Sequence, residues 1–149
     1  MLVGVRRSGK TYILYETIQK LRSEVDPRNI IYINFEDYRL FGITVCDLSS
    51  LIDAYFELFP QKRKKKIYLF LDEIQEVPDW EKFVRRIYDD LNAQIFVTGS
   101  SSKLLSKEIA SSLRGRSITY EVFPLSFKEY LQFRDIEINL HSSKSLLYI

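Results

Sequence analysis

Eight residues near the start of the chain have the types and the order that hold a phosphate group. They read Gly4-Val5-Arg6-Arg7-Ser8-Gly9-Lys10-Thr11, a G-x-x-x-x-G-K-T pattern that we call the phosphate loop. The two glycines let the backbone turn tightly and bring its N–H groups close to an anion. Lys10 can reach the outer phosphates of a nucleotide, and Thr11 can place its hydroxyl on Mg²⁺. The residues expected to surround the phosphates are Gly4, Arg7, Ser8, Gly9, Lys10 and Thr11.

A pair of acids supplies the second part of this chemistry. Asp72 and Glu73 directly follow the apolar run 67–71, the best candidate for a buried strand in the chain. An acid at this position, called Walker B, holds Mg²⁺ together with the hydroxyl of the phosphate loop, so we expect Asp72 and Thr11 to share the metal. Glu73 would then orient or deprotonate the attacking water.

These residues need a scaffold, and the hydrophobic pattern indicates one. Short apolar runs at 1–3, 29–35, 67–71 and 95–97 predict buried strands, and alternation at 118, 120 and 122 predicts a further strand with one buried face. Helical spacing follows the phosphate loop from residue 14 to 25 and recurs at 48–59, 80–91 and 103–113. Asp47 is the expected N-cap of the second helix, and Ser126 with Glu129 fits a capping box that opens a last one.

Alternating strands and helices predict an α/β fold: a doubly wound parallel sheet of about five strands with helices on both faces. In such sheets, ligands bind beyond the carboxyl ends of the strands. Four polar clusters would meet at that edge: the phosphate loop, Glu36-Asp37, Asp72-Glu73 and residues 98–101. We expect one domain over residues 1–133 and a tail of uncertain structure over 134–149.

Composition excludes several classes of protein. The chain has 149 residues and a net charge of +2, which is too small to indicate a nucleic-acid or membrane partner by itself. Its longest apolar run is far shorter than a membrane span, and no signal peptide is visible. Cys46 is the one cysteine, so there is no disulfide framework, and we expect it to be buried in a protein of the reducing cytoplasm.

With these motifs in place, the chain resembles the core of an AAA-type P-loop ATPase. It is most similar to a group of prokaryotic ATP-binding proteins, common in archaea. That group carries GVRRSGKT, LDEIQEVPDWE and TGSSSKLLS stretches, found here at residues 4–11, 71–81 and 98–106. The resemblance extends to about Phe133 and implies Mg²⁺-dependent binding and hydrolysis of ATP. The chain contains no Asn-Lys-x-Asp or Thr-Lys-x-Asp that would recognise guanine, which favours ATP over GTP.

The resemblance also implies roles for residues outside the two motifs. A polar residue after the fourth strand senses the γ-phosphate; Ser100 is the best match and Thr98 the alternative. An arginine, often from a neighbouring subunit, stabilises the transition state, and Arg114 and Arg116 are the candidates, with Arg116 preferred. A homo-oligomer or another protein partner would then complete the site. Intact members add an N-terminal helix and a C-terminal lid that helps to hold adenine, so we expect their absence to affect adenine affinity and turnover.

Lys62 to Lys66 form a run of five basic residues. Such a run can bind nucleic acid, but it also commonly solvates the approach to an apolar strand, and we favour the second interpretation. Three functions stay open: an ATPase, a truncated nucleotide-binding module with little or no turnover, and a nucleic-acid-binding protein that uses ATP as a switch.

Overall fold

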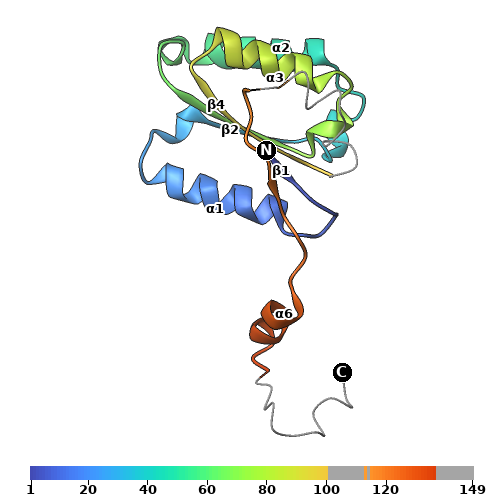
Figure 1. Ribbon diagram of the computed structural model, residues 1–149. Coiled ribbons are helices and arrows are strands. Elements are labelled where there is room, and N and C mark those ends of the chain that lie inside the picture. Colours follow the sequence, from blue (N-terminus) through green and yellow to red (C-terminus); the bar gives the residue numbers. More distant parts are fainter. Residues whose placement is uncertain (101–112, 114, 137–149) are drawn as a thin grey trace, which may run out of the picture.

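One parallel sheet forms from five strands: β1 (Leu2–Val3), β2 (Ile30–Asn34), β3 (Ile67–Asp72), β4 (Ala93–Gly99) and β5 (Tyr120–Glu121). Their order across the sheet is β2-β3-β4-β1-β5 (Figure 1). The computed structural model describes residues 1–100, 113 and 115–136. The helix predicted at 103–113 therefore lies almost wholly outside the described residues, as do Arg114 and most of the 134–149 tail.

Helices cover both faces of the sheet. One face carries α1 (Lys10–Arg22), and the other carries α2 (Val45–Leu58) and α3 (Trp80–Asp90) (Figure 1). A short helix, α6 (Phe127–Phe133), lies apart from the sheet at the end of an extended segment (Figure 1). The architecture confirms the predicted doubly wound α/β fold and brings the carboxyl ends of β1, β3 and β4 to one edge.

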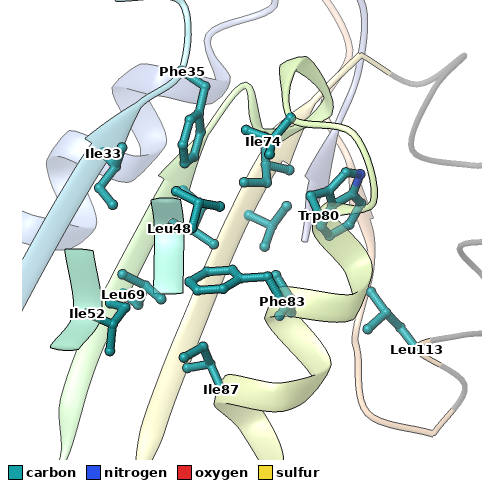
Figure 2. Close-up of a cluster of buried hydrophobic side chains, with 14 of the residues drawn as sticks. Ile33, Phe35, Leu48, Ile52, Leu69, Ile74, Trp80, Phe83, Ile87 and Leu113 are labelled. Carbon is teal, nitrogen blue, oxygen red and sulfur yellow. The ribbon is translucent and has the colours of Figure 1, made fainter. Parts of the chain in front are cut away.

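The main core lies between the sheet and the α2–α3 layer. Figure 2 shows its side chains converging from β2, β3, α2 and α3, and the labelled members include Ile33, Leu69, Leu48, Ile52, Phe83 and Ile87. On the opposite face, Phe70 of β3 stacks on Phe96 of β4 with their ring centroids 4.4 Å apart. Burying a side chain of this size contributes about 1.5–3 kcal/mol. Because β3 is buried on both faces, it fixes the position of Asp72 at its end.

Two local predictions were wrong. Thr44 is the N-cap of α2, and Asp47 sits three residues later in a capping box in which each side chain bonds the other's backbone. The helix thus starts one turn earlier than apolar spacing alone suggested. Cys46 lies in this exposed first turn and is itself exposed, whereas we expected it to be buried. The capping box of Ser126 and Glu129 at the start of α6 is confirmed.

The last strand differs from its prediction. β5 has two residues, and Ile118 and Tyr120 are 70% and 61% exposed, so the strand has no buried face. Its neighbour β1 is equally short and pairs with β4 at Thr98 and Gly99 only, so β5 is joined to the rest of the sheet through a two-residue strand. A hollow lies beside this short pairing, lined by Ile13, Tyr88, Ile95 and Tyr120 among others.

Candidate functional site

The phosphate loop joins β1 to α1 and has the backbone of an anion-binding turn. Arg7 and Gly9 have φ angles of 65° and 96°, in the left-handed region that a tight anion-binding loop uses. Gly4 has a different role, because an added Cβ would lie 2.2 Å from the carbonyl oxygen of Val122. The Ser8 Oγ atom is buried without a hydrogen-bond partner in the structure. Such an orphaned hydroxyl inside the loop fits a ligand that brings acceptor oxygens.

Lys10, the first residue of α1, is 4% exposed. Its Nζ donates to the carbonyl oxygens of Gly4 at 3.1 Å and Val5 at 2.9 Å, and lies 3.8 Å from Oε1 of Glu73. A buried ammonium group bound mainly by loop carbonyls can exchange these contacts for phosphate oxygens. The side chain is therefore held at the loop that we expect to surround the phosphates.

Three hydroxyl groups surround the carboxylate of Asp72, which is 1% exposed. Thr11 donates to Oδ1 at 3.3 Å, Thr98 donates to the same oxygen, and Tyr32 donates to Oδ2 at 2.9 Å. The pKa of Tyr32 is raised by burial and by its hydrogen bonds with Tyr15 and Asp72, which keeps its hydroxyl protonated as a donor. Thr11 and Asp72, predicted to share a metal, thus meet although 61 positions separate them.

Glu73 follows β3 in a strained conformation, with φ at 54°. Its backbone N–H donates to the Thr98 hydroxyl at 3.0 Å, and its Oε2 accepts from Nε2 of Gln75 at 2.6 Å. The side chain is 12% exposed and faces Lys10. A left-handed non-glycine residue persists only where its surroundings hold it, so β4 and Gln75 fix the direction of this carboxylate.

A pocket opens above these groups at the carboxyl edge of the sheet. Its lining consists of Arg6, Arg7, Gly9, Lys10, Thr11, Tyr12, Glu36 and Glu73. Glu36 forms an ion pair with Arg6 of the phosphate loop, and this pair raises the pKa of the arginine. Asp37 turns away, because hydrogen bonds from Arg39 hold it and lower its pKa to about 2. Of the Glu36-Asp37 pair, Glu36 alone therefore lines this pocket.

The two sensor candidates have different surroundings. Thr98 is fully buried, and its hydroxyl already connects Asp72 to the backbone of Glu73. Ser100 is half-buried directly after β4, at the same edge as the pocket. The hydroxyl of Thr98 is thus engaged in positioning the two acids, which leaves Ser100 as the better candidate for contact with a ligand.

Arg116 does not reach the pocket within its own chain. Its Nε lies 3.5 Å from Oδ1 of Asp89, in the last turn of α3. That turn precedes β4 and lies at the edge of the sheet opposite the phosphate loop. A catalytic role for Arg116 would therefore have to be played in a neighbouring copy of the chain.

The oxygen atoms at the end of β3 suit Mg²⁺. Magnesium is commonly bound by one or two carboxylates together with substrate phosphates and water. Asp72 and Thr11 supply a carboxylate and a hydroxyl oxygen side by side. Within residues 1–100, 113 and 115–136, no cluster of three or more His, Cys, Asp or Glu side chains could hold a metal alone. The donor set thus fits an ion that a nucleotide helps to bind.

Sequence reasoning missed Tyr32, Tyr15 and Gln75. Tyr32 comes from β2 and Tyr15 from α1, and their hydroxyl oxygens are 3.2 Å apart. The signal for Tyr15 was its place one helical turn after Thr11, on the same face of α1. Tyr32 lies two residues before the strand end, in a run that predicted only burial.

Three of the five residues in the basic run 62–66 contact nearby side chains. Lys62 is 7% exposed, and its Nζ lies 2.6 Å from Oδ2 of Asp26. Arg63 and Lys66 sit over the aromatic rings of Phe56 and Tyr68. Residues 63–66 are exposed, as a solvated approach to β3 would be, whereas the buried Lys62 departs from that interpretation.

Comparisons with known proteins agree with this geometry. The family described as AAA domain matches residues 1–131. An uncharacterised protein of Methanocaldococcus jannaschii is 48% identical over 138 residues, which are 93% of this chain and 29% of that protein. A second, from Haemophilus influenzae, is 37% identical over 139 residues, 92% of this chain and 34% of the relative. A third, again from M. jannaschii, is 32% identical over 132 residues, 88% of this chain and 27% of the relative.

The chain spans about a third or less of the curated relatives that it matches. Within the part of the chain that the structure describes, no helix has the length and apolar character to cross a bilayer. The match over residues 1–131, the parallel sheet and the meeting of Lys10, Thr11 and Asp72 at one edge agree with one another. The chain therefore belongs to the AAA domain family and has the core of a nucleotide-binding, P-loop ATPase-like protein.

Proposed function

We propose that this chain binds Mg²⁺-ATP in the phosphate-loop pocket and hydrolyses it to ADP and phosphate. The observation that carries the proposal is the contact between Thr11 and Asp72, 3.3 Å apart at the end of a buried strand. Their meeting beside a buried lysine supports a site for a metal-bound phosphate.

Each residue would have a distinct task. Lys10 would release the carbonyl oxygens of Gly4 and Val5 and bind the outer phosphates. Thr11 and Asp72 would hold Mg²⁺, which when bound neutralises charge on the phosphate oxygens.

Glu73 would carry the reaction itself. It would accept a proton from the attacking water while the oxygen of that water bonds to the terminal phosphorus. The bond to the bridging oxygen breaks, and ADP leaves with the bonding electron pair. Ser100 is the candidate for contact with the terminal phosphate. Turnover would further depend on an arginine from a neighbouring copy, for which Arg116 is the described candidate.

Thermal unfolding with and without Mg²⁺-ATP tests the binding site. At about 100 times the dissociation constant, a ligand that binds the folded state alone should raise the midpoint by roughly 5–10 °C. Lys10→Ala should lose this shift. Lys20→Ala is the matched control, because it removes an exposed lysine from the same helix, paired there with Glu16. A folded wild-type protein with no shift, or an equal shift in Lys10→Ala, would contradict the proposal.

A further inference from the structure

Asp72 is an anion buried beside donors that carry no charge. Its two carboxylate oxygens accept hydrogen bonds from the hydroxyls of Thr11, Thr98 and Tyr32. No ion pair among residues 1–100, 113 and 115–136 includes it, and the nearby ammonium of Lys10 faces Glu73 instead. Taking a carboxylate out of water without a countercharge is expensive, so the hydroxyls must supply most of what water supplied.

The bonds at Oδ2 have a fixed direction. An ionised carboxylate only accepts, so Tyr32 must donate its proton to Asp72. The hydrogen bond between the two tyrosines, whose oxygens lie 3.2 Å apart, must then run from the Tyr15 hydroxyl to the oxygen of Tyr32. The two rings also pack together, with centroids 5.5 Å apart. The chain Tyr15 to Tyr32 to Asp72 therefore links α1, β2 and β3 through directed hydrogen bonds.

The two carboxylate oxygens are held by different groups. Oδ1 faces Thr11, and Oδ2 is held by Tyr32 on the side of β2. In the β2–β3 pairing, Asn34 is level with Asp72. Tyr32, two residues before Asn34 on β2, therefore reaches Asp72 from the neighbouring strand. Tyr15 stands one helical turn after Thr11, so α1 reaches Oδ1 directly through Thr11 and Oδ2 only indirectly, through the bond between Tyr15 and Tyr32.

We propose that Tyr32, braced by Tyr15, is a positioning residue that holds Oδ2 of Asp72 so that Oδ1 faces Thr11 and the metal position. The inference rests on the proposed function. With Mg²⁺ bound, Thr11 and Asp72 would hold the ion, and the hydrogen bond from Tyr32 would still fix the direction of Oδ2. Partners of a metal ligand commonly change metal affinity about 10- to 100-fold, since they set the direction of its lone pairs.

The test is a titration with Mn²⁺ in the presence of saturating ADP, followed by the electron paramagnetic resonance signal of unbound Mn²⁺. Tyr32→Phe should weaken Mn²⁺ binding about 10-fold or more. Its affinity for ADP in EDTA should be unchanged, since no metal is then bound and Tyr32 is absent from the lining of the pocket. Tyr55→Phe is the matched control, because it removes a tyrosine hydroxyl that bonds the carbonyl oxygen of Arg28, outside the site.

The outcomes separate the two proposals. Equal Mn²⁺ affinity in wild type and Tyr32→Phe would overturn the positioning role. If ADP still binds in that case, the proposed nucleotide site stands. A wild-type protein that binds neither ADP nor Mn²⁺ overturns the proposed function and this inference with it. If Tyr32→Phe does not fold, Tyr15→Phe decides, since Tyr15 is 45% exposed and its hydroxyl acts on Asp72 only through Tyr32. It should weaken Mn²⁺ binding several-fold, and no weakening there contradicts the inference.

Discussion

The two ends of β3 both carry charges, but they handle them differently. Before the strand, Lys62 is buried and paired with Asp26, and Arg63 and Lys66 lie over aromatic rings. At the carboxyl end, Asp72 is the last residue of the strand; it is buried among hydroxyl groups and forms no ion pair within the described residues. At the amino end, the buried charge of Lys62 has a partner of opposite sign, whereas the described partners of the Asp72 carboxylate are hydroxyl groups.

This difference separates structural charge from functional charge. A paired and locally satisfied ion contributes to the fold, and its removal should lower stability. A buried anion held by neutral donors lowers the stability of the fold, as functional sites commonly do, and suits the binding of a metal ion. Three substitutions test the comparison, two at the carboxyl end and one at the other.

The largest effect is expected for Glu73→Gln. Glutamine is close in shape and keeps a side-chain oxygen for Gln75, but it cannot accept a proton from water at neutral pH. The turnover number should fall about 100-fold or more. The thermal shift with Mg²⁺-ATP should persist, and phosphate release measures the loss. Glu57→Gln, at an exposed position of α2, is the control. If wild type and Glu73→Gln release phosphate equally slowly, the chain is a nucleotide-binding module rather than an ATPase.

Asp72→Asn addresses the cost of the unpaired anion. Asparagine keeps the shape and one acceptor oxygen but removes the buried charge. The free energy of unfolding without ligand should stay unchanged or rise by about 1 kcal/mol. The Mg²⁺-dependent part of the nucleotide shift should disappear. Urea unfolding with and without Mg²⁺-ATP measures both. A loss of several kcal/mol without ligand would instead make Asp72 a structural residue like those at the other end of β3.

The contrast between the two ends also shows what the sequence can predict. Apolar runs at 29–35, 67–71 and 95–97 located three strands, because strands covered by helices leave an uninterrupted apolar pattern. Burial on both faces holds for β3, whereas β2 and β4 are partly exposed. The phosphate loop and Asp72-Glu73 were visible because a local spacing is part of their chemistry. Thr98 was the alternative to Ser100 as the residue that senses the γ-phosphate, and the structure places its hydroxyl between Asp72 and Glu73.

Other features were hidden because they depend on partners that are distant in the chain. Periodicity indicates which face of a strand is buried, but it does not show which hydroxyl meets which carboxylate 40 residues away, as for Tyr32 and Asp72. The same limit applied to Lys62, whose partner Asp26 lies 36 residues earlier in the chain. Lys62 is therefore buried, whereas the sequence predicted a solvated residue. The exposure of β5 depends on the number of residues over which its neighbour β1 pairs with the sheet, and the sequence around β5 does not indicate that number.

The smallest effect is expected at the amino end of β3, for Asp26→Asn. Asparagine can still accept from the backbone N–H of Arg28, so the turn before β2 is preserved while the charge opposite Lys62 is removed. Stability should fall at pH 7, because the buried ammonium then lacks its partner. Nucleotide binding should be unchanged, since this pair is remote from the phosphate-loop pocket. Asp53→Asn, at an exposed position of α2, is the control for charge alone.

The pH dependence gives this prediction its sign. The hydrogen bond from Lys62, followed by that from the Arg28 backbone, lowers the pKa of Asp26 in the folded state. The stabilisation is therefore complete above the ordinary pKa of an aspartate and is lost as the pH falls through the lowered one. Wild type and Asp26→Asn should differ in unfolding midpoint at pH 7 and converge in acid. A difference that persists after Asp26 is protonated would show that the carboxylate charge is not its source, and the comparison between the two ends of β3 would fail at this residue.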